Sequence, residues 1–262
     1  MDTLHDRVAV VTGAAGGIGR GIALACAAAG MRLVLADLDA KGLDAVAEEV
    51  SGLGAPVLPV PTDVSDARSV DALADATLAE YGAVHVVCNN AGVSTVGVQW
   101  ETPLADWEWV VGVNLWGVVN GIRSFVPHLI EQDEAHIVST SSMGGLMTGA
   151  LLGPYTATKH AVVGLSKGLR AELAFKAPHV GVSVICPGEI HTEMIERIKV
   201  EPSPESAAML DRLRAVIAEG LPPLEVGRMV IESIKSRKFW ILPNAKPHLE
   251  TVRTEMDELF GS

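Results

Sequence analysis

Residues 8–19 read VAVVTGAAGGIG, a short apolar run followed directly by a glycine-rich turn. The glycines Gly13, Gly17 and Gly19 have the spacing Gly-x3-Gly-x-Gly, and a helical pattern of apolar residues begins inside the turn. Glycines between a strand and a helix let the backbone approach a pyrophosphate, whose charge the amides of the helix N-terminus stabilise. A glycine cluster is also compatible with an ordinary tight turn. Its position at the first strand–helix junction favours a dinucleotide site.

Short apolar runs and longer helical patterns alternate along most of the chain. The predicted strands are 8–11, 33–36, 57–60, 84–88, 136–139, 182–186 and, at the edge, 239–242. The predicted helices are 17–29, 40–50, 66–80, 104–130 and 155–175. Continuous apolar runs are typical of parallel strands covered on both faces. We therefore expect an α/β fold: a single Rossmann-type doubly wound parallel sheet with helices on both faces, and a ligand beyond the carboxyl ends of the strands.

The length of 262 residues suits one large domain, and no linker divides the chain. We expect one dinucleotide-binding and catalytic domain over 1–262. Residues 189–223 depart from the alternation because they contain prolines at 202, 204, 222 and 223. An irregular insertion after the last central strand predicts a substrate lid, with a simple surface excursion as the alternative.

Composition excludes several classes of partner. The formal net charge of −12 argues against nucleic-acid or anionic-membrane surfaces, which need clustered basic side chains. The longest apolar stretch, 22–31, is shorter than the roughly 20 residues of a spanning helix, and no signal segment precedes the first strand. These features predict a soluble, cytoplasmic protein. Three scattered cysteines without a CxxC pair, and no histidine pair at ligand spacing, predict neither a disulfide nor a metal site.

Asp37 ends the second predicted strand, 18 residues after Gly19. A carboxylate at this place accepts hydrogen bonds from an adenosine ribose and repels a 2′-phosphate. Leu38 follows it, and Gly16 stands where a basic residue could offset that repulsion. The alternative role is the N-cap of the next helix, which Asp39 fills better. The sequence therefore favours NAD over NADP.

Several further motifs follow the glycine turn. They are Thr12-Gly13-x3-Gly17-x-Gly19, Asn89-Asn90-Ala91-Gly92, Asn114, Ser142, Tyr155-x3-Lys159 and Pro187-Gly188. In order and spacing they resemble the short-chain dehydrogenase/reductase family over nearly the whole chain.

The resemblance implies a role for each matching residue. Tyr155 would be the catalytic acid/base, supported by Lys159, Ser142 and Asn114, the last holding a water that links Lys159 to solvent. Asp63 and Val64 would contact the adenine, Asn90 the adenosine-side ribose, and Ile190 and Thr192 the nicotinamide. The complete implied cofactor set is Gly13, Gly17, Ile18, Gly19, Asp37, Asp63, Val64, Asn90, Gly92, Tyr155, Lys159, Pro187, Gly188, Ile190 and Thr192.

The chemistry of this group can also be argued from the residues. Tyr155 and Lys159 lie four apart on a predicted helix and are therefore neighbours. An ammonium at about 4 Å, at an effective dielectric near 20, favours phenolate by roughly 4 kcal/mol, or about 3 pKa units. Ser142 can hold the substrate oxygen, although the three residues before it are chemically equivalent and only the family spacing selects it. Asn114 has a structural alternative, a helix kink satisfied by its side chain.

These residues predict an NAD-dependent oxidoreductase that interconverts a secondary alcohol and a ketone. The alternatives are an NADPH-dependent 3-oxoacyl-thioester reductase and a non-catalytic NAD-binding regulator. Segments 112–155 and 220–243 are similar to a subgroup with dehydrogenases of benzylic alcohols in aryl ethers, which implies a bulky apolar substrate. Four tryptophans, at 100, 107, 109 and 116, and apolar residues of the 189–223 segment fit pocket walls or simply a core.

Two glycine pairs bear on assembly. Gly117 and Gly121 are four apart on one predicted helix, and Gly164 and Gly168 on the next. Each glycine inside a helix costs about 1 kcal/mol relative to alanine, so such pairs indicate a close-packed partner. The partner could be the sheet or an adjacent helix of the same chain. The family resemblance implies instead a homodimer or homotetramer packed through these helices.

Overall fold

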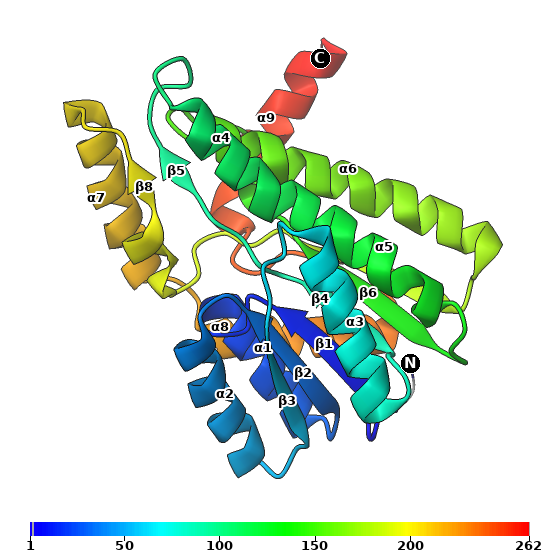
Figure 1. Cartoon of the computed structure of the whole chain (residues 1–262). Helices are drawn as coiled ribbons and strands as arrows, with labels where there is room; N and C mark the ends of the chain where they lie inside the picture. Colours follow the sequence, from blue (N-terminus) through cyan, green and yellow to red (C-terminus); the bar gives the residue numbers. More distant parts are fainter. Residues whose placement is uncertain (2, 262) are drawn as a thin grey trace.

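Seven of the short apolar runs form one sheet in the computed structural model, which describes residues 1 and 3–261 (Figure 1). Its strands are β1 Val8–Thr12, β2 Arg32–Asp37, β3 Val57–Pro61, β4 Val86–Asn89, β6 Ala135–Thr140, β7 Val180–Ile185 and β9 Trp240–Ile241. The order is β3-β2-β1-β4-β6-β7-β9, and every neighbouring pair is parallel. The strand order reverses between β1 and β4, where a doubly wound sheet opens a crevice for its ligand.

Helices cover both faces of this sheet. On one face α1 Gly17–Ala28, α2 Ala40–Gly52 and α8 Pro223–Ser236 contribute to one hydrophobic core. On the other face α3 Ala67–Tyr81, α5 Gly117–Leu129 and α6 Gly153–Lys176 contribute to a second core. Both cores consist largely of aliphatic side chains from the apolar strands, which explains why the strands show no alternation of polar residues. The predicted doubly wound α/β fold is confirmed.

The predicted helix over 104–130 is wrong in one respect. The structure has α4 Leu104–Val111 and α5 Gly117–Leu129 with a π-helical turn, Gly112–Trp116, between them. A π turn makes i→i+5 hydrogen bonds, is rare, and often marks a functional position. Asn114 lies at its centre.

The proline-containing insertion has more structure than the sequence indicated. It forms a 3-10 turn Glu193–Arg197, strand β8 Lys199–Val200 and helix α7 Pro204–Ala218. Strand β8 pairs in parallel with β5 Thr95–Val96, in a two-stranded sheet separate from the main one. In Figure 1, β8 lies between α7 and β5.

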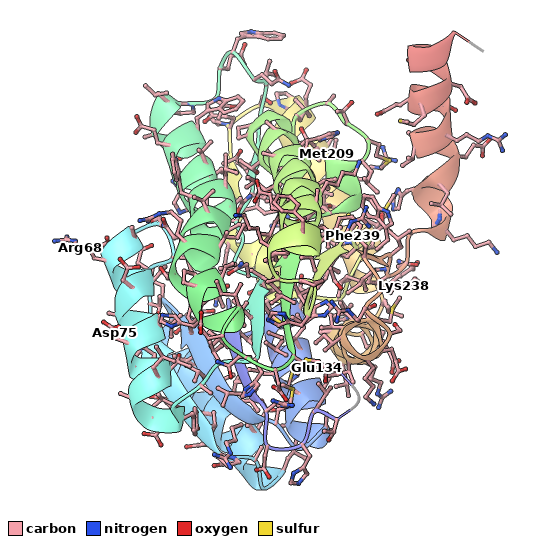
Figure 2. The ribbon with its side chains drawn as sticks, turned by 90° about the vertical axis from the view of Figure 1, so that its right-hand side faces the viewer. Arg68, Asp75, Glu134, Met209, Lys238 and Phe239 are labelled. Atoms are coloured by element: carbon pink, nitrogen blue, oxygen red, sulfur yellow. The ribbon has the colours of Figure 1, made fainter. Side chains whose placement is uncertain are left out.

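The carboxyl-terminal segment was not predicted as a helix. After a 3-10 turn at Lys246–His248, α9 Leu249–Phe260 extends away from the two helical layers (Figures 1 and 2). Leu249, Val252 and Met256 have helical spacing, which was the available signal. Among the described residues, no helix is long and apolar enough to cross a bilayer.

Candidate active site

The glycine turn between β1 and α1 is shaped by close backbone contacts. Gly13 and Gly17 have φ of +66° and +50°, a region that favours glycine. A Cβ on Gly13 would lie 2.8 Å from Cα of Ala91, and one on Gly19 would overlap the Gly13 carbonyl oxygen. Ile18 is the second residue of α1, lies between the last two glycines and is partly buried. The turn is thus a cradle of bare backbone at a helix N-terminus, which fits a dinucleotide pyrophosphate.

Asn90 connects this turn to the neighbouring strands. Its Nδ2 donates to the Thr12 carbonyl at 3.0 Å, and its Oδ1 accepts from Thr140 Oγ1 at 3.2 Å. The Thr12 hydroxyl in turn accepts from the Asn90 backbone N–H at 2.9 Å. Both ends of the Asn90 side chain therefore hold β1, β4 and β6 together at their carboxyl ends. The supporting residues Thr12 and Thr140 were not singled out from the sequence as site residues in their own right.

Asp37 lies at the end of β2, where an adenosine ribose would lie. Its Oδ2 accepts from the Ala15 N–H at 3.0 Å, and its Oδ1 accepts from the Asp39 N–H at 3.0 Å. The N-cap of α2 is Asp39, whose Oδ1 accepts from the Gly42 N–H at 3.1 Å. The Asp37 carboxylate is therefore held by two backbone amides and is not the cap of α2.

Asp63 and Val64 follow β3 on the same side. Oδ1 of Asp63 accepts from both the N–H and the hydroxyl of Ser65, at 2.9 and 2.6 Å. Val64 is buried, and its carbonyl accepts from Asn120 Nδ2 at 2.9 Å. These contacts fix the carboxylate and the backbone at the place where the family resemblance expects an adenine.

Tyr155 and Lys159 lie one turn apart near the start of α6. The Lys159 side chain is 3% exposed, and its Nζ donates to the Thr140 carbonyl at 3.0 Å. Nζ lies 5.5 Å from the centre of the Tyr155 ring, farther than the roughly 4 Å assumed from sequence. Burial lowers the pKa of Lys159 to about 8. Burial also raises the pKa of Tyr155, and the Ser142 hydroxyl acts in the opposite direction.

Ser142 lies beside Tyr155 just beyond β6. A Cβ on Gly144 would lie 3.4 Å from the Tyr155 ring and 3.5 Å from Ser142 Oγ, so the two side chains flank the same point. Ser142 Oγ also accepts from the Gly144 N–H at 3.0 Å. The neighbouring Ser141 hydroxyl points elsewhere, donating to the Lys159 carbonyl at 2.8 Å.

Asn114 is buried in the π turn and faces the loop after β4. Its Oδ1 accepts from the Val93 N–H at 2.8 Å, and its Nδ2 donates to the Val93 carbonyl at 2.9 Å and to Thr158 Oγ1 at 3.2 Å. The structural alternative for Asn114, a helix irregularity satisfied by its side chain, is therefore present, and its expected role of holding a water stays a prediction. A Cβ on Gly92 would lie 3.3 Å from Lys159 Nζ and 3.5 Å from Asn114 Oδ1. The missing side chain of Gly92 therefore leaves room for both groups to lie close to the backbone after β4.

The segment after β7 contacts the turn after β6 and the glycine turn after β1. The Pro187 carbonyl accepts from the Met143 N–H at 2.9 Å, and Ile190 forms a bridge with Leu221. Thr192 reaches the glycine turn, with its methyl 3.1 Å from the position of a Cβ on Gly17.

The C-terminal segment fixes the same junction, a contribution that the sequence did not indicate. Glu189 follows Gly188, and its Oε1 lies 2.9 Å from His248 Nε2. Asn244 Nδ2 donates to the Glu189 carbonyl at 3.0 Å. A Cβ on Gly188 would overlap the Asn244 carbonyl oxygen, so the tail packs closely there.

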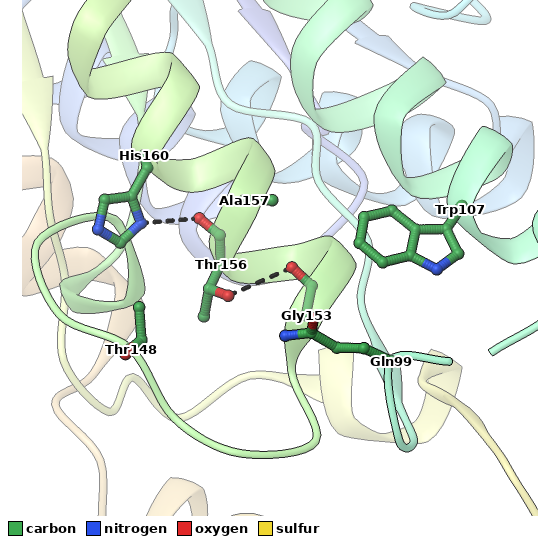
Figure 3. A pocket seen from close by; sticks show the side chains of 7 residues that line it. All are labelled: Gln99, Trp107, Thr148, Gly153, Thr156, Ala157 and His160. Carbon is green, nitrogen blue, oxygen red and sulfur yellow. Dashed lines mark hydrogen bonds between the residues drawn. The ribbon is translucent and has the colours of Figure 1, made fainter. Parts of the chain in front are cut away.

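A pocket of about 320 Å³ opens next to the first turn of α6 (Figure 3). It is lined by Gln99, Trp107, Thr148, Gly153, Thr156, Ala157 and His160. The four clustered tryptophans do not form one pocket. Trp107 lines this pocket, Trp109 lies under Lys199, and Trp100 and Trp116 are 85% and 55% exposed.

The two glycine pairs have different environments. A Cβ on Gly117 would lie 2.8 Å from Val64 Cγ2, and one on Gly121 would overlap Asn89 Oδ1. Gly117 and Gly121 are thus packed against other residues of the same chain, and not against a second copy. Gly164 and Gly168 are exposed, and a Cβ on either meets nothing within 4 Å among the described residues.

All the sequence-predicted site residues thus lie at the carboxyl ends of β1, β2, β3, β4, β6 and β7, or on the helices that flank them. Within the described residues, no group of three or more His, Cys, Asp or Glu side chains could hold a metal ion. The same edge of the sheet carries the glycine turn and the group of Tyr155, Lys159 and Ser142. Such a site can bind a dinucleotide and move a proton at a substrate oxygen.

Comparison with known proteins agrees with this geometry. A family model described as short chain dehydrogenase matches residues 7–202. The chain is 37% identical over 260 residues to 1-deoxy-11-beta-hydroxypentalenate dehydrogenase of Streptomyces exfoliatus, covering 98% of this chain and 90% of that protein. It is 33% identical over 252 residues to C alpha-dehydrogenase of Sphingobium sp. strain SYK-6, covering 93% and 82%. A short chain dehydrogenase/reductase from Burkholderia phymatum, solved in complex with NAD, matches with a TM-score of 0.95 and 38% identity over 100% of this chain and 97% of that chain.

Proposed function

The chain belongs to the short-chain dehydrogenase/reductase family, and from this premise we propose that it is an NAD-dependent enzyme interconverting a bulky apolar secondary alcohol and its ketone. The family assignment makes it an oxidoreductase with a nicotinamide cofactor. The observation that carries the finer proposal is the group of Tyr155, Lys159 and Ser142 at the mouth of the dinucleotide cleft.

In the proposed mechanism Ser142 and Tyr155 hold the substrate oxygen. During oxidation Tyr155 takes the hydroxyl proton as general base, and during reduction it returns that proton. Lys159 favours the phenolate form of Tyr155 by its positive charge. When bound, the cofactor supplies the hydride acceptor or donor. Asn114 keeps the loop after β4 in place and is proposed to hold a water through which Lys159 exchanges protons with solvent.

The cofactor set is the one expected from sequence, with Gly13, Gly17, Ile18 and Gly19 at the pyrophosphate. Asp63, Val64, Asn90 and Gly92 are proposed to hold the adenosine half. Pro187, Gly188, Ile190 and Thr192, together with Tyr155 and Lys159, are proposed to hold the nicotinamide half.

Preference for NAD over NADP rests on Asp37. Its carboxylate is held by the Ala15 and Asp39 amides at the end of β2, and a 2′-phosphate there would meet its negative charge. The similar Burkholderia phymatum structure contains NAD. This evidence counts against an NADPH-dependent 3-oxoacyl-thioester reductase.

The proposed substrate class rests on relatives and on the insertion. One relative is named as a dehydrogenase of a hydroxypentalenate and another as a C alpha-dehydrogenase. We propose that residues 189–223 act as the substrate lid of a single catalytic domain. Partly buried apolar side chains of this segment, such as Met194, Ile195 and Ile198, suit an apolar substrate.

Assembly and location complete the proposal. The exposed pair Gly164 and Gly168 supports packing of α6 against a second copy, as a homodimer or homotetramer. Cys26, Cys88 and Cys186 are all buried and free, which fits the reducing cytoplasm.

The test compares wild type with Tyr155→Phe, using a panel of hydrophobic secondary alcohols and NADH formation as the signal. Wild type should turn over with NAD at least tenfold better than with NADP. The variant should lose nearly all turnover and still bind NADH, because only the proton-transfer hydroxyl is removed. Activity above a few per cent in the variant would contradict the mechanism. NADH binding without turnover of any alcohol or ketone by wild type would favour the non-catalytic regulator.

A further inference from the structure

Ser141 lies between the end of β6 and Ser142, and the proposed mechanism gives it no part. Its side chain is buried, at 1% exposed, and its hydroxyl donates to the Lys159 backbone carbonyl at 2.8 Å. The side-chain ammonium of the same lysine donates to the Thr140 carbonyl at 3.0 Å. Two consecutive residues at the end of β6 therefore hold Lys159, one by its side chain and the other by its backbone.

The bond from Ser141 joins α6 to the sheet. A carbonyl inside an α-helix accepts from the N–H four residues later, so the Lys159 carbonyl has a helical partner besides Ser141. The Ser141 bond is thus additional to those that build the helix. The sheet side of the contact is itself fixed, because the Ser141 N–H donates to the Ile185 carbonyl of β7 at 2.7 Å.

The turn that follows Ser142 packs against the same contact. Met143–Gly145 form a 3-10 turn whose N-cap is Ser142. A Cβ on Gly145 would overlap Ser141 Oγ and would lie 2.6 Å from the Lys159 carbonyl oxygen. The turn that begins at Ser142 and the helix that carries Lys159 are therefore in direct backbone contact around the Ser141 hydroxyl.

This contact lies between the two hydroxyl groups proposed to hold the substrate oxygen. Ser142 follows Ser141 directly in the chain, and Tyr155 lies one helical turn before Lys159. A displacement of α6 relative to β6 would change the distance between the Tyr155 and Ser142 side chains. Acid–base catalysis needs its groups within hydrogen-bond reach of the reacting atom, and a misplacement of about 1 Å can cost up to about a hundredfold in rate.

We propose that Ser141 is a positioning residue, which attaches α6 to the end of β6 at Lys159 and so sets the distance between Tyr155 and Ser142. This inference rests on the proposed interconversion of an alcohol and a ketone. Ser141 acts through the helix and not on the substrate. Loss of its hydroxyl should therefore slow the chemical step and leave NADH binding unchanged.

The test measures NADH formation in the first turnover of a hydrophobic secondary alcohol by stopped flow. Ser141→Ala should be about three- to tenfold slower than wild type, which corresponds to the loss of one buried neutral hydrogen bond. The KM for the alcohol and the Kd for NADH should stay within about twofold, because the lost contact matters only in the transition state. Ser141→Thr keeps the hydroxyl and should restore most of the rate, and Ser141→Cys, with a weaker donor, should lie between.

Ser166→Ala is the matched control. Ser166 is also 1% exposed and lies on α6, and its hydroxyl donates to the Val162 carbonyl at the same distance of 2.8 Å. That bond stays within the helix, so its loss should lower stability in a similar way and leave the rate unchanged. Amide hydrogen exchange of residues 155–161 gives a second measurement, which should be about threefold faster in Ser141→Ala than in wild type or in the control.

The outcomes separate the positioning role from the proposed function. Equal rates in wild type and Ser141→Ala would refute the positioning role. An equal loss of rate in Ser166→Ala would also refute it, because general destabilisation would then be the cause. If wild type turns over no alcohol or ketone, the proposed function fails, and amide exchange alone decides whether Ser141 attaches the helix: unchanged exchange in Ser141→Ala refutes the attachment, and faster exchange supports it.

Discussion

Replacing Lys159 by methionine tests how Tyr155, the proposed general base, is ionised. The Lys159 ammonium lies 5.5 Å from the centre of the Tyr155 ring. With 5.5 Å taken as the approximate separation of the two charges, and an effective dielectric of about 20, a positive charge favours the phenolate by about 3 kcal/mol. This corresponds to about 2 pKa units. We expect loss of this charge to raise the pKa of Tyr155, so alcohol oxidation should activate about 2 pH units higher in Lys159→Met.

The assay is the pH dependence of kcat/KM for alcohol oxidation, with NADH binding measured separately for each variant. Burial lowers the pKa of Lys159 to about 8, so the profile should cover both sides of this value. Lys159→Arg keeps the charge, and its profile should shift less than that of the methionine variant. An unchanged profile in Lys159→Met, with activity retained, would refute the electrostatic role.

Four other predictions follow from the structure. Asp37→Ala should weaken NADH binding about ten- to a hundredfold, because charge-assisted hydrogen bonds to the cofactor are lost. It should also reduce the preference in affinity for NAD over NADP. Unchanged binding constants for both cofactors would contradict this prediction. Gly121→Ala should lower the free energy of unfolding by about 1–3 kcal/mol in urea titrations, because the added methyl group overpacks the contact with Asn89. The double variant Gly164→Leu with Gly168→Leu should leave the fold intact, because both positions are open. Its mass in sedimentation should shift towards the 27.5 kDa of one chain. Burial lowers the pKa of His136 to about 3, so between pH 6.5 and 5 this histidine takes up a proton in the unfolded chain and not in the folded one. The free energy of unfolding should therefore fall by about 2 kcal/mol over this pH range. If the free energy of unfolding of a His136→Gln variant depends on pH in the same way, His136 is excluded as the cause.

Much of the fold could be predicted because its strands are short and apolar throughout. Each predicted strand of the main sheet lies within two residues of the observed one. The two-residue strands β5 and β8 could not be found this way, because their pairing depends on the path of the chain and not on a local pattern. The π turn at 112–116 was also hidden, since hydrophobic spacing continues across it.

The sequence proposes candidate site residues, but it does not give the distances between them or their hydrogen-bond partners. Tyr155, Lys159 and Ser142 are identified by spacing, whereas the Thr140 carbonyl that holds Lys159 is a backbone group without a sequence signal. The glycine pairs show the same limit. Equal spacing made them look equivalent, and only the packing distinguishes Gly121, against Asn89, from the exposed Gly164.

The wide turn at Asn114 also determines how the two halves of its helix are rotated relative to each other. Each residue of an α-helix turns the chain by about 100°, and a π turn accommodates one residue more than an α turn. Before it, α4 directs Asp106 towards Lys199; after it, α5 places Gly117 against Val64. A regular helix of one residue fewer would rotate one of these contacts out of line. The number of residues from 104 to 129 therefore helps to set both contacts. Single substitutions leave this number unchanged, so they do not test its effect.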